Sequence, residues 1–369
     1  MNDRGLNIGI ICFSRQGRNT AQRIAQYLTG KNDGSNITLC CKSRFITEST
    51  KQSLRDWTAA RFGDSDAIIF VSSCGIAVRA IAPFVADKKT DPAVIVADER
   101  GLNCISLLSG HLGGANELTL ELGEAIGAHP VVTTATDVNM KLAPDMLAKI
   151  NDCEIDDIEK SKIVAAAILN EHSVWIYNGS EIVSVIGEEI VPVDGERIET
   201  ENGLEEYSIY VSPFVNDKSS GATTMWLIPR RVYVGIGCRR GTGQEAIADA
   251  VYEAVNEAGI DKRSIRSFAS VSLKADEQGL LEFCRNNRFK IRFFDAGELE
   301  SLDGDFTGSA FVKDVTGTDN VCERSAMAAA CNDPYYAEDD PEPYFCLRKH
   351  VKNGVTVAIA VRERRMRYE

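Results

Sequence analysis

Short apolar runs alternate with helical patterns along most of this chain, and this alternation constrains the fold more than any other feature. Residues 7–13, 67–71 and 93–97 are apolar runs with the length of buried β-strands. The segments between such runs, for example residues 18–27, repeat their apolar side chains at helical spacing. Strands that alternate with amphipathic helices form βαβ units, in which the strands are parallel. The pattern therefore predicts an α/β protein with mostly parallel sheets.

The same alternation divides the chain into three regions. It is regular over residues 1–137, changes to helices and short strands in an acidic background over residues 138–229, and restarts over residues 230–369. The turn-rich stretch 216–222 indicates a boundary or an exposed hairpin. A chain of 369 residues is also too long for one ordinary core. We therefore expect two α/β sandwich-like domains joined by a smaller α+β middle region.

Charge and hydropathy exclude several classes of partner. The formal net charge of −13 argues against a nucleic acid and against an anionic membrane surface. A local basic pocket remains compatible with it, because salt screens charges beyond about 8 Å. Residues 348–369 are basic, and we interpret them as a solvated final strand. No apolar run approaches the roughly 20 residues that span a bilayer, and none near the start suits a signal peptide, so we expect a cytoplasmic protein.

The cysteines and histidines do not show the spacing of a metal site. There are eleven cysteines, an odd number without a CxxC pair, which suits neither a zinc site nor a disulfide framework. Cys12 and Cys104 lie in apolar strands, where a reduced thiol packs as a small hydrophobic side chain. The four histidines also lack ligand spacing, so no protein-bound metal is expected.

A glycine-rich turn at residues 235–243 is the first candidate binding site. It joins a strand to a helix, and glycines such as Gly237 let backbone N–H groups approach an anion at the helix N-terminus. Arg239 and Arg240 add charges that suit carboxylates or phosphates. No Walker lysine and no ribose-binding acid follows, which favours a carboxylate. The alternative is a tight turn with surface arginines.

A second turn, at residues 109–116, also joins a strand to a helix. His111 is flanked by glycines, so its ring could face a ligand and act as an acid or a base. Alternatively, the ring packs over the turn. Asn116 has the chemistry of a helix N-cap.

A third turn, at residues 72–79, contains Gly75 and Arg79 and follows a buried strand. The C-terminal ends of parallel strands share one edge of a sheet, and ligands bind there. We therefore expect the three turns to meet at one site.

Two further stretches carry charged candidates. Lys274 stands just before Asp276 and Glu277, which suit the start of a helix, whereas a lysine there is unfavourable unless it meets an anion. Glu323 precedes a helix of small residues at 325–330. It is either a general base or a capping residue.

Together, these segments resemble the cobalt-precorrin-5A hydrolase (CbiG) family of anaerobic cobalamin (vitamin B12) biosynthesis. The resemblance rests on residues 74–79, on 109–116 with 133–137, and on 234–240 with 274–277. Each motif is modest, but their order and spacing extend the match over most of the chain. One departure is Gly243, where a proline after Thr242 is more usual.

The resemblance implies a C–C hydrolase with no cofactor of its own, because the substrate carries the cobalt. The substrate would be cobalt-precorrin-5A, a tetrapyrrole macrocycle with acetate and propionate arms, one of them closed as a δ-lactone. Opening the lactone frees an alcohol, and cleavage of the C–C bond then releases acetaldehyde and gives cobalt-precorrin-5B. His111, Glu277 and Glu323 are the candidate bases, with the choice left open. The candidate substrate-binding residues are Gly75, Arg79, Gly110, Gly113, Gly114, Asn116, Gly237, Arg239, Arg240 and Lys274.

Two other functions remain open from the residues alone. A non-catalytic tetrapyrrole carrier would bind the macrocycle without releasing acetaldehyde. A nucleotide-binding enzyme would use the turn at 235–243 as its phosphate loop, although the missing ribose acid counts against it. Beyond the substrate, transient contacts with neighbouring pathway enzymes and a homodimer are left open as partners.

Overall fold

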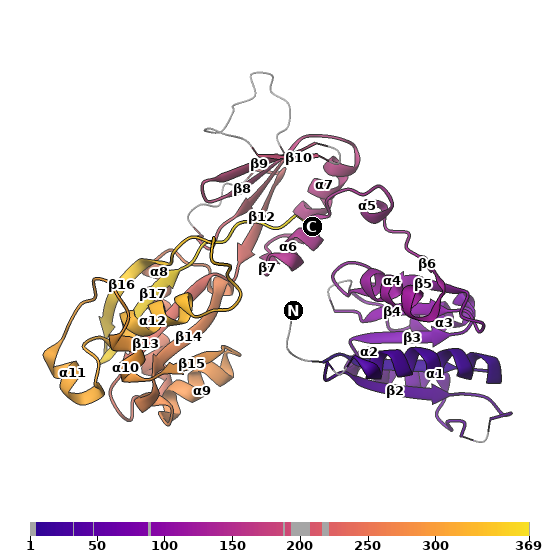
Figure 1. The fold of residues 1–369 in the computed structure, drawn as a ribbon, viewed down its shortest axis with the longest axis horizontal. Coiled ribbons are helices and arrows are strands. Elements are labelled where there is room, and N and C mark those ends of the chain that lie inside the picture. The colour runs from indigo at the N-terminus through magenta and orange to yellow at the C-terminus, as the bar shows by residue number, and fades with distance from the viewer. Residues whose placement is uncertain are drawn as a thin grey trace. The chain divides into compact units, whose positions relative to one another are not determined.

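The chain folds into two compact units, residues 1–146 and 147–369, each of which is described by itself (Figure 1). The structure is a computed structural model that describes residues 5–31, 33–46, 48–87, 90–186, 189–192, 207–215 and 221–368. Residues 216–220, the larger part of the turn-rich stretch, lie outside the described residues. The three-region division stays a prediction.

The first unit is built on one six-stranded sheet with the order β2-β1-β3-β4-β5-β6. Its strands from β2 to β4 are parallel, whereas β5 is antiparallel to β4, and β6 is parallel to β5. The elements are β1 (Asn7–Cys12), α1 (Arg15–Gly30), β2 (Asn36–Cys41), α2 (Leu54–Asp64), β3 (Ala67–Val71), α3 (Cys74–Ile81), β4 (Ala93–Ala97), β5 (Asn103–Leu108), α4 (Ala115–Ile126), β6 (His129–Val131) and α5 (Ala135–Val138). Helix α6 (Pro144–Ile150) contains the boundary between the two units.

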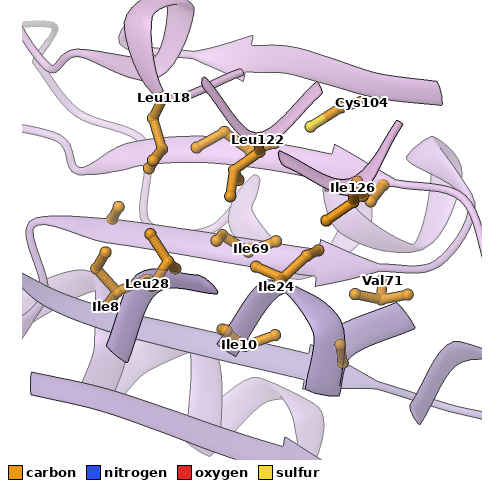
Figure 2. Close-up of a cluster of buried hydrophobic side chains, with 14 of the residues drawn as sticks. Ile8, Ile10, Ile24, Leu28, Ile69, Val71, Cys104, Leu118, Leu122 and Ile126 are labelled. Carbon is orange, nitrogen blue, oxygen red and sulfur yellow. The ribbon is translucent and has the colours of Figure 1, made fainter. Parts of the chain in front are cut away.

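Helices cover both faces of this sheet. Figure 2 shows α1 and α4 on one face, where Ile24 and Leu122 meet strand residues such as Ile69. On the other face, Trp57 of α2 and the alanines of α3 pack against Phe70. The central strands β1, β3 and β4 are apolar on both sides because neither face meets water, as in parallel sheets. The predicted α/β class is therefore confirmed.

The second unit begins with a mixed six-stranded sheet, ordered β10-β9-β8-β11-β12-β7. Strands β8, β11 and β12 are parallel to one another, and the remaining pairs are antiparallel. Helix α7 begins at an N-cap, Asp157, whose carboxylate accepts hydrogen bonds from the next backbone N–H groups. The elements are β7 (Cys153–Ile155), α7 (Ile158–Leu169), β8 (Val174–Asn178), β9 (Glu181–Ile186), β10 (Glu189–Pro192), β11 (Tyr207–Val211) and β12 (Thr224–Pro229).

The same unit ends in a five-stranded sheet, ordered β15-β14-β13-β17-β16, with helices on both faces. Strands β13, β14 and β15 are parallel and joined through α8 and α9, as the βαβ pattern predicts. The elements are β13 (Val232–Cys238), α8 (Gln244–Glu257), η1 (Lys262–Ser264), β14 (Ile265–Val271), η2 (Ser272–Lys274), α9 (Gln278–Asn286), β15 (Ile291–Phe294), α10 (Ala296–Glu300), α11 (Ala310–Thr316), α12 (Val321–Cys331), β16 (Tyr344–Lys352) and β17 (Val355–Val361).

The basic C-terminal stretch differs from the predicted solvated strand. It forms an antiparallel hairpin, and β17 lies buried between β13 and β16. Beyond it, Arg364 is 3% exposed, with its guanidinium carbon 4.0 Å from the centre of the Tyr335 ring. The backbone of Arg367 exchanges hydrogen bonds with Asn151. Arg364 is buried because the Tyr335 ring, distant in sequence, covers its guanidinium, whereas the Arg367 side chain is exposed.

Within the described parts of the chain, no helix is both long enough and apolar enough to cross a membrane. Cys12 and Cys104 are fully buried in their strands, which confirms that they pack as small hydrophobic side chains.

Candidate active site

A cavity of about 550 Å³ opens beside the C-terminal end of β13 in the second unit. Its walls come from the turn after β13, from η2, from α11, from the start of α12 and from the β16–β17 hairpin. Three predicted binding residues, Arg239, Arg240 and Lys274, line it together. Arg239 and Lys274, 35 residues apart, meet here because β13 and β14 are adjacent parallel strands that end at the same edge of the sheet.

The two arginines of the turn have different surroundings. Arg240 donates a hydrogen bond to Asp276 at 3.0 Å, and both side chains are largely exposed. Such surface pairs contribute little to stability. Arg239 has no ion pair or side-chain hydrogen bond among the described residues. Arg239 is thus the arginine available for an incoming anion.

Lys274 lines the cavity and forms an ion pair with the buried Glu277. Its ammonium lies 3.5 Å from the Glu277 carboxylate, and the two residues are 8% and 4% exposed. The same carboxylate accepts a hydrogen bond from the Gly241 backbone N–H at 2.6 Å. Glu277 does not line the cavity. Its geometry favours a role in holding the basic turn and Lys274 over a role as the base.

The glycines of β13 allow α12 and β17 to pack closely against this strand. A Cβ on Gly235 would overlap the Cys322 carbonyl of α12, and one on Gly237 would lie 2.6 Å from the Thr356 hydroxyl oxygen. The turn therefore begins later than predicted, after Cys238. Gly237 does line the cavity, but these close contacts explain its lack of a side chain. A phosphate loop starting at Gly235, as the nucleotide-binding alternative requires, is not formed.

Apolar side chains border the charged part of the cavity. Leu273, Val315 and Val351 line it while remaining 47%, 58% and 61% exposed. Large apolar side chains that gather in an open cavity indicate a surface for an apolar ligand. A ligand that suits this cavity therefore has an apolar body and anionic groups.

Glu323, the second predicted acid, is completely buried at the start of α12. One carboxylate oxygen accepts from the Thr307 backbone N–H at 2.9 Å, and the other accepts from the Lys349 backbone N–H at 3.2 Å. The helix cap is Asn320, whose side chain accepts from the Glu323 N–H. The sequence left Glu323 as either a general base or a helix cap. Its position supports neither role, because the carboxylate accepts hydrogen bonds from the backbone of a loop and of strand β16.

His111, in the first unit, lies between two carboxylates. Its Nδ1 is 3.1 Å from Asp145, and its Nε2 is 2.6 Å from Asp137 and 3.2 Å from the Thr136 hydroxyl. The hydrogen bond to Asp145, opposed by burial and helped by Asp137, raises the pKa of the histidine. Sequence analysis singled out His111 but not its two acids. Asp137 and Asp145 lie too far along the chain from His111 for a local pattern to connect them with it. Residues 133–137 do belong to the motif that carried the resemblance.

Neighbouring residues hold this histidine turn in shape. The helix cap is Gly114, with a φ of 82°, and not Asn116 as predicted. Asn116 is instead buried, and its amide donates to Asp137 at 3.1 Å. Side chains on Gly110 or Gly113 would meet Asn116 or Ser109 at less than normal contact distance. These glycines and Asn116 therefore position the Asp137 carboxylate.

Within the first unit, the turns at 72–79 and 109–116 do not meet as expected. The stretch containing Gly75 is helix α3, and the Arg79 guanidinium donates to the Gly75 carbonyl of that same helix. Because β5 runs antiparallel to β4, the turn after β5 lies at the sheet edge opposite the end of β3. The turn after β13 belongs to the second unit, so its meeting with either of them stays a prediction.

Across the residues that the structure describes, no group of three or more His, Cys, Asp or Glu side chains is placed to hold a metal ion.

Both the basic cavity and the histidine turn fall in segments that match known families. Residues 56–137 match the family described as "Cobalamin synthesis G N-terminal", and residues 232–360 match "Cobalamin synthesis G C-terminus". The "Cobalt-precorrin-5A hydrolase" of Salmonella typhimurium is 37% identical over 257 residues, which are 69% of this chain and 73% of that protein. The chain belongs to the cobalt-precorrin-5A hydrolase family.

Other relatives extend the same match. The "Cobalt-precorrin-5A hydrolase" of Priestia megaterium is 31% identical over 84% of this chain and 82% of its own length. The "Probable cobalt-precorrin-5A hydrolase" of Methanocaldococcus jannaschii is 25% identical over 96% of this chain and 98% of its own length. The family resemblance drawn from the sequence is therefore confirmed.

Proposed function

We propose that this chain is a hydrolase of cobalamin biosynthesis that opens the δ-lactone of cobalt-precorrin-5A and releases the extruded carbon as acetaldehyde, giving cobalt-precorrin-5B. The observation that carries this proposal is the family membership, with relatives of that name covered over more than two thirds of their length. The cobalt belongs to the substrate, and the protein supplies binding groups and a base. We propose the cytoplasm as the compartment of this protein.

The basic cavity suits the carboxylate arms of such a macrocycle. Arg239 and Lys274 can each take one carboxylate, in charge-assisted hydrogen bonds that are stronger than neutral ones. Leu273, Val315 and Val351 offer apolar contact to the ring. Ordered N–H groups and cations also stabilise the negative charge that develops when water adds to the lactone carbonyl.

The histidine turn supplies the proton acceptor in this proposal. Of the three candidate bases, Glu277 and Glu323 accept hydrogen bonds from backbone N–H groups, whereas His111 is hydrogen-bonded to Asp137, whose side chain is 41% exposed. Water first opens the lactone to an acid and an alcohol. A base then takes the alcohol proton, the C–C bond breaks, and its electron pair passes into the macrocycle, which is protonated as acetaldehyde leaves.

The test is anaerobic incubation of the full chain with cobalt-precorrin-5A, followed by acetaldehyde detection and mass analysis of the corrinoid. We expect acetaldehyde in equal amount to the corrinoid converted. The His111→Gln variant is expected to bind the substrate and release acetaldehyde far more slowly, whereas His129→Gln, at an exposed position, serves as the matched control. Binding without acetaldehyde from the unaltered chain would contradict the enzyme and support a tetrapyrrole carrier.

A further inference from the structure

Strand β16 brings one more cation to the basic cavity, Lys349, which no sequence motif indicated. Lys349 lines the cavity, and its side chain has no ion pair or hydrogen bond among the described residues. The other basic residues of the same strand are engaged: Lys352 pairs with Glu253, and Arg348 donates to the Asp305 carbonyl. Lys349 is therefore the member of this basic strand whose charge is uncompensated.

The backbone at Lys349 departs from a regular ladder. The pairing of β16 with β17 shifts register between Leu347 and His350, which is the signature of a β-bulge. Bulges redirect a side chain and are frequent beside functional sites. Here the Lys349 N–H, displaced from the ladder, donates to the buried carboxylate of Glu323. Glu323 thus fixes the bulge, and with it the point from which the lysine side chain starts.

The surroundings of Lys349 favour the binding of an anion. Asp319 is the acidic residue lining the cavity, and its carboxylate already accepts a hydrogen bond from Arg324 at 2.7 Å. The positive end of α12 faces the same space, because Asn320 and Val321 also line it. Burial raises the pKa of the Cys322 thiol to about 11, and the positive charge of Lys349 opposes that rise.

We propose that Lys349 is a substrate-binding residue whose ammonium takes one carboxylate arm of the macrocycle, with Glu323 as its positioning residue. This inference rests on the proposed function, since it names the group on that substrate which β16 recognises. Together with Arg239, Arg240 and Lys274, it gives the cavity four cations carried by three separate segments, β16, the turn after β13 and η2. Such a set suits a ligand with several carboxylates spread around a ring, and is more than a single phosphate or acetate requires.

The test compares two cobalt corrinoids that differ in the charge of their arms. Cobyrinic acid carries free carboxylates, whereas in cobinamide the arms are amides. Binding of each to the full chain is measured by calorimetry for the unaltered protein, for Lys349→Met and for the matched control Lys352→Met. We expect Lys349→Met to weaken cobyrinic acid binding by at least about tenfold, the effect of losing one charge-assisted hydrogen bond. Cobinamide binding, and either ligand with Lys352→Met, is expected to change less than about twofold.

Three results would overturn this proposal. They are equal weakening by the two lysine variants, equal weakening for the two corrinoids, and no binding of millimolar cobyrinic acid to the unaltered chain. Glu323→Gln adds a test of positioning. We expect it to weaken cobyrinic acid binding without altering cobinamide binding, whereas a purely structural role would weaken both.

Turnover separates this proposal from the function it rests on. If Lys349→Met releases acetaldehyde from cobalt-precorrin-5A with an unchanged KM, the lysine assignment fails and the hydrolase stands. If the unaltered chain releases none while Lys349 still discriminates between the two corrinoids, the hydrolase fails and the carboxylate site stands.

Discussion

The Glu277 carboxylate accepts a hydrogen bond from the Gly241 backbone N–H at 2.6 Å, across 36 residues of sequence. Glu277 is almost fully buried, and its other carboxylate oxygen faces the Lys274 ammonium. One buried acid therefore connects the turn that carries Arg239 to the segment that carries Lys274. Glu323 makes the equivalent connection to Lys349. Both acids appear as candidate bases in the sequence, and both hold cation-bearing backbone in the structure.

Replacing Glu277 is expected to loosen the basic turn. Glu277→Gln keeps one acceptor oxygen for Gly241 but removes the charge that Lys274 faces, which leaves a buried ammonium without its counter-ion. We expect the free energy of unfolding to fall by about 1–3 kcal/mol. Denaturant unfolding of the full chain measures it. Glu245→Gln, at an exposed position in the first turn of α8, is the control and is expected to stay within about 0.5 kcal/mol.

The two arginines of the turn are expected to contribute unequally to binding. Arg239 lacks a partner among the described residues, whereas Arg240 is paired with Asp276 at the surface. Arg239→Ala is therefore expected to weaken cobyrinic acid binding by about tenfold, and Arg240→Ala by less than about threefold. Calorimetric titration of each variant measures this. Equal losses would mean that Arg240 leaves Asp276 to meet the ligand.

His111 is expected to make stability depend on pH. Its pKa is raised in the folded protein, chiefly by the hydrogen bond to Asp145. The stabilisation is therefore fully present below the unfolded-state pKa of about 6.5, and is lost as pH rises through the higher folded-state value. In Asp145→Asn, we expect the histidine pKa to fall and this loss to shrink. NMR titration of the imidazole and thermal unfolding from pH 6 to pH 9 measure both effects. The control variant His129→Asn is expected to leave the His111 pKa and the pH dependence of unfolding unchanged.

Gly235 is expected to tolerate no side chain. A Cβ there would overlap the Cys322 carbonyl, and helix α12 cannot retreat without losing its contact with β13. Gly235→Ala is expected to destabilise the protein by about 3 kcal/mol. Gly297→Ala is the matched control, because Gly297 is exposed in helix α10 and an added methyl group would meet no neighbouring atom. We expect this control to be neutral or stabilising by up to about 1 kcal/mol. Urea unfolding of both variants measures the difference.

Most elements of the fold were predictable from local patterns. The strands at 67–71 and 93–97 coincide with β3 and β4, because a short apolar run that is buried on both faces has few other structures open to it. Helix α3 was missed, since residues 72–79 combine serines and a glycine with only two helical turns. The hairpin of β16 and β17 was missed because its basic side chains resemble a solvated strand.

Less of the candidate site was predictable. Arg239, Arg240 and Lys274 do share one cavity, because successive parallel strands β13 and β14 end at one edge. The partners of His111, and the presence of Lys349 in the cavity, follow from contacts between residues far apart in sequence. No single motif contains them.

The sequence by itself determined the alternation of strands and helices, the family, and three cations of the binding cavity, because these depend on periodicity and on motifs within a few residues. Only the tertiary structure decided the direction of β5, which puts the turn at His111 on the edge opposite the start of α3. It also decided that Glu277 and Glu323 serve as anchors. The physical reason is that a strand's direction and the burial of a charge depend on which distant segment packs beside them, and hydrogen-bond partners for a buried carboxylate come from that segment.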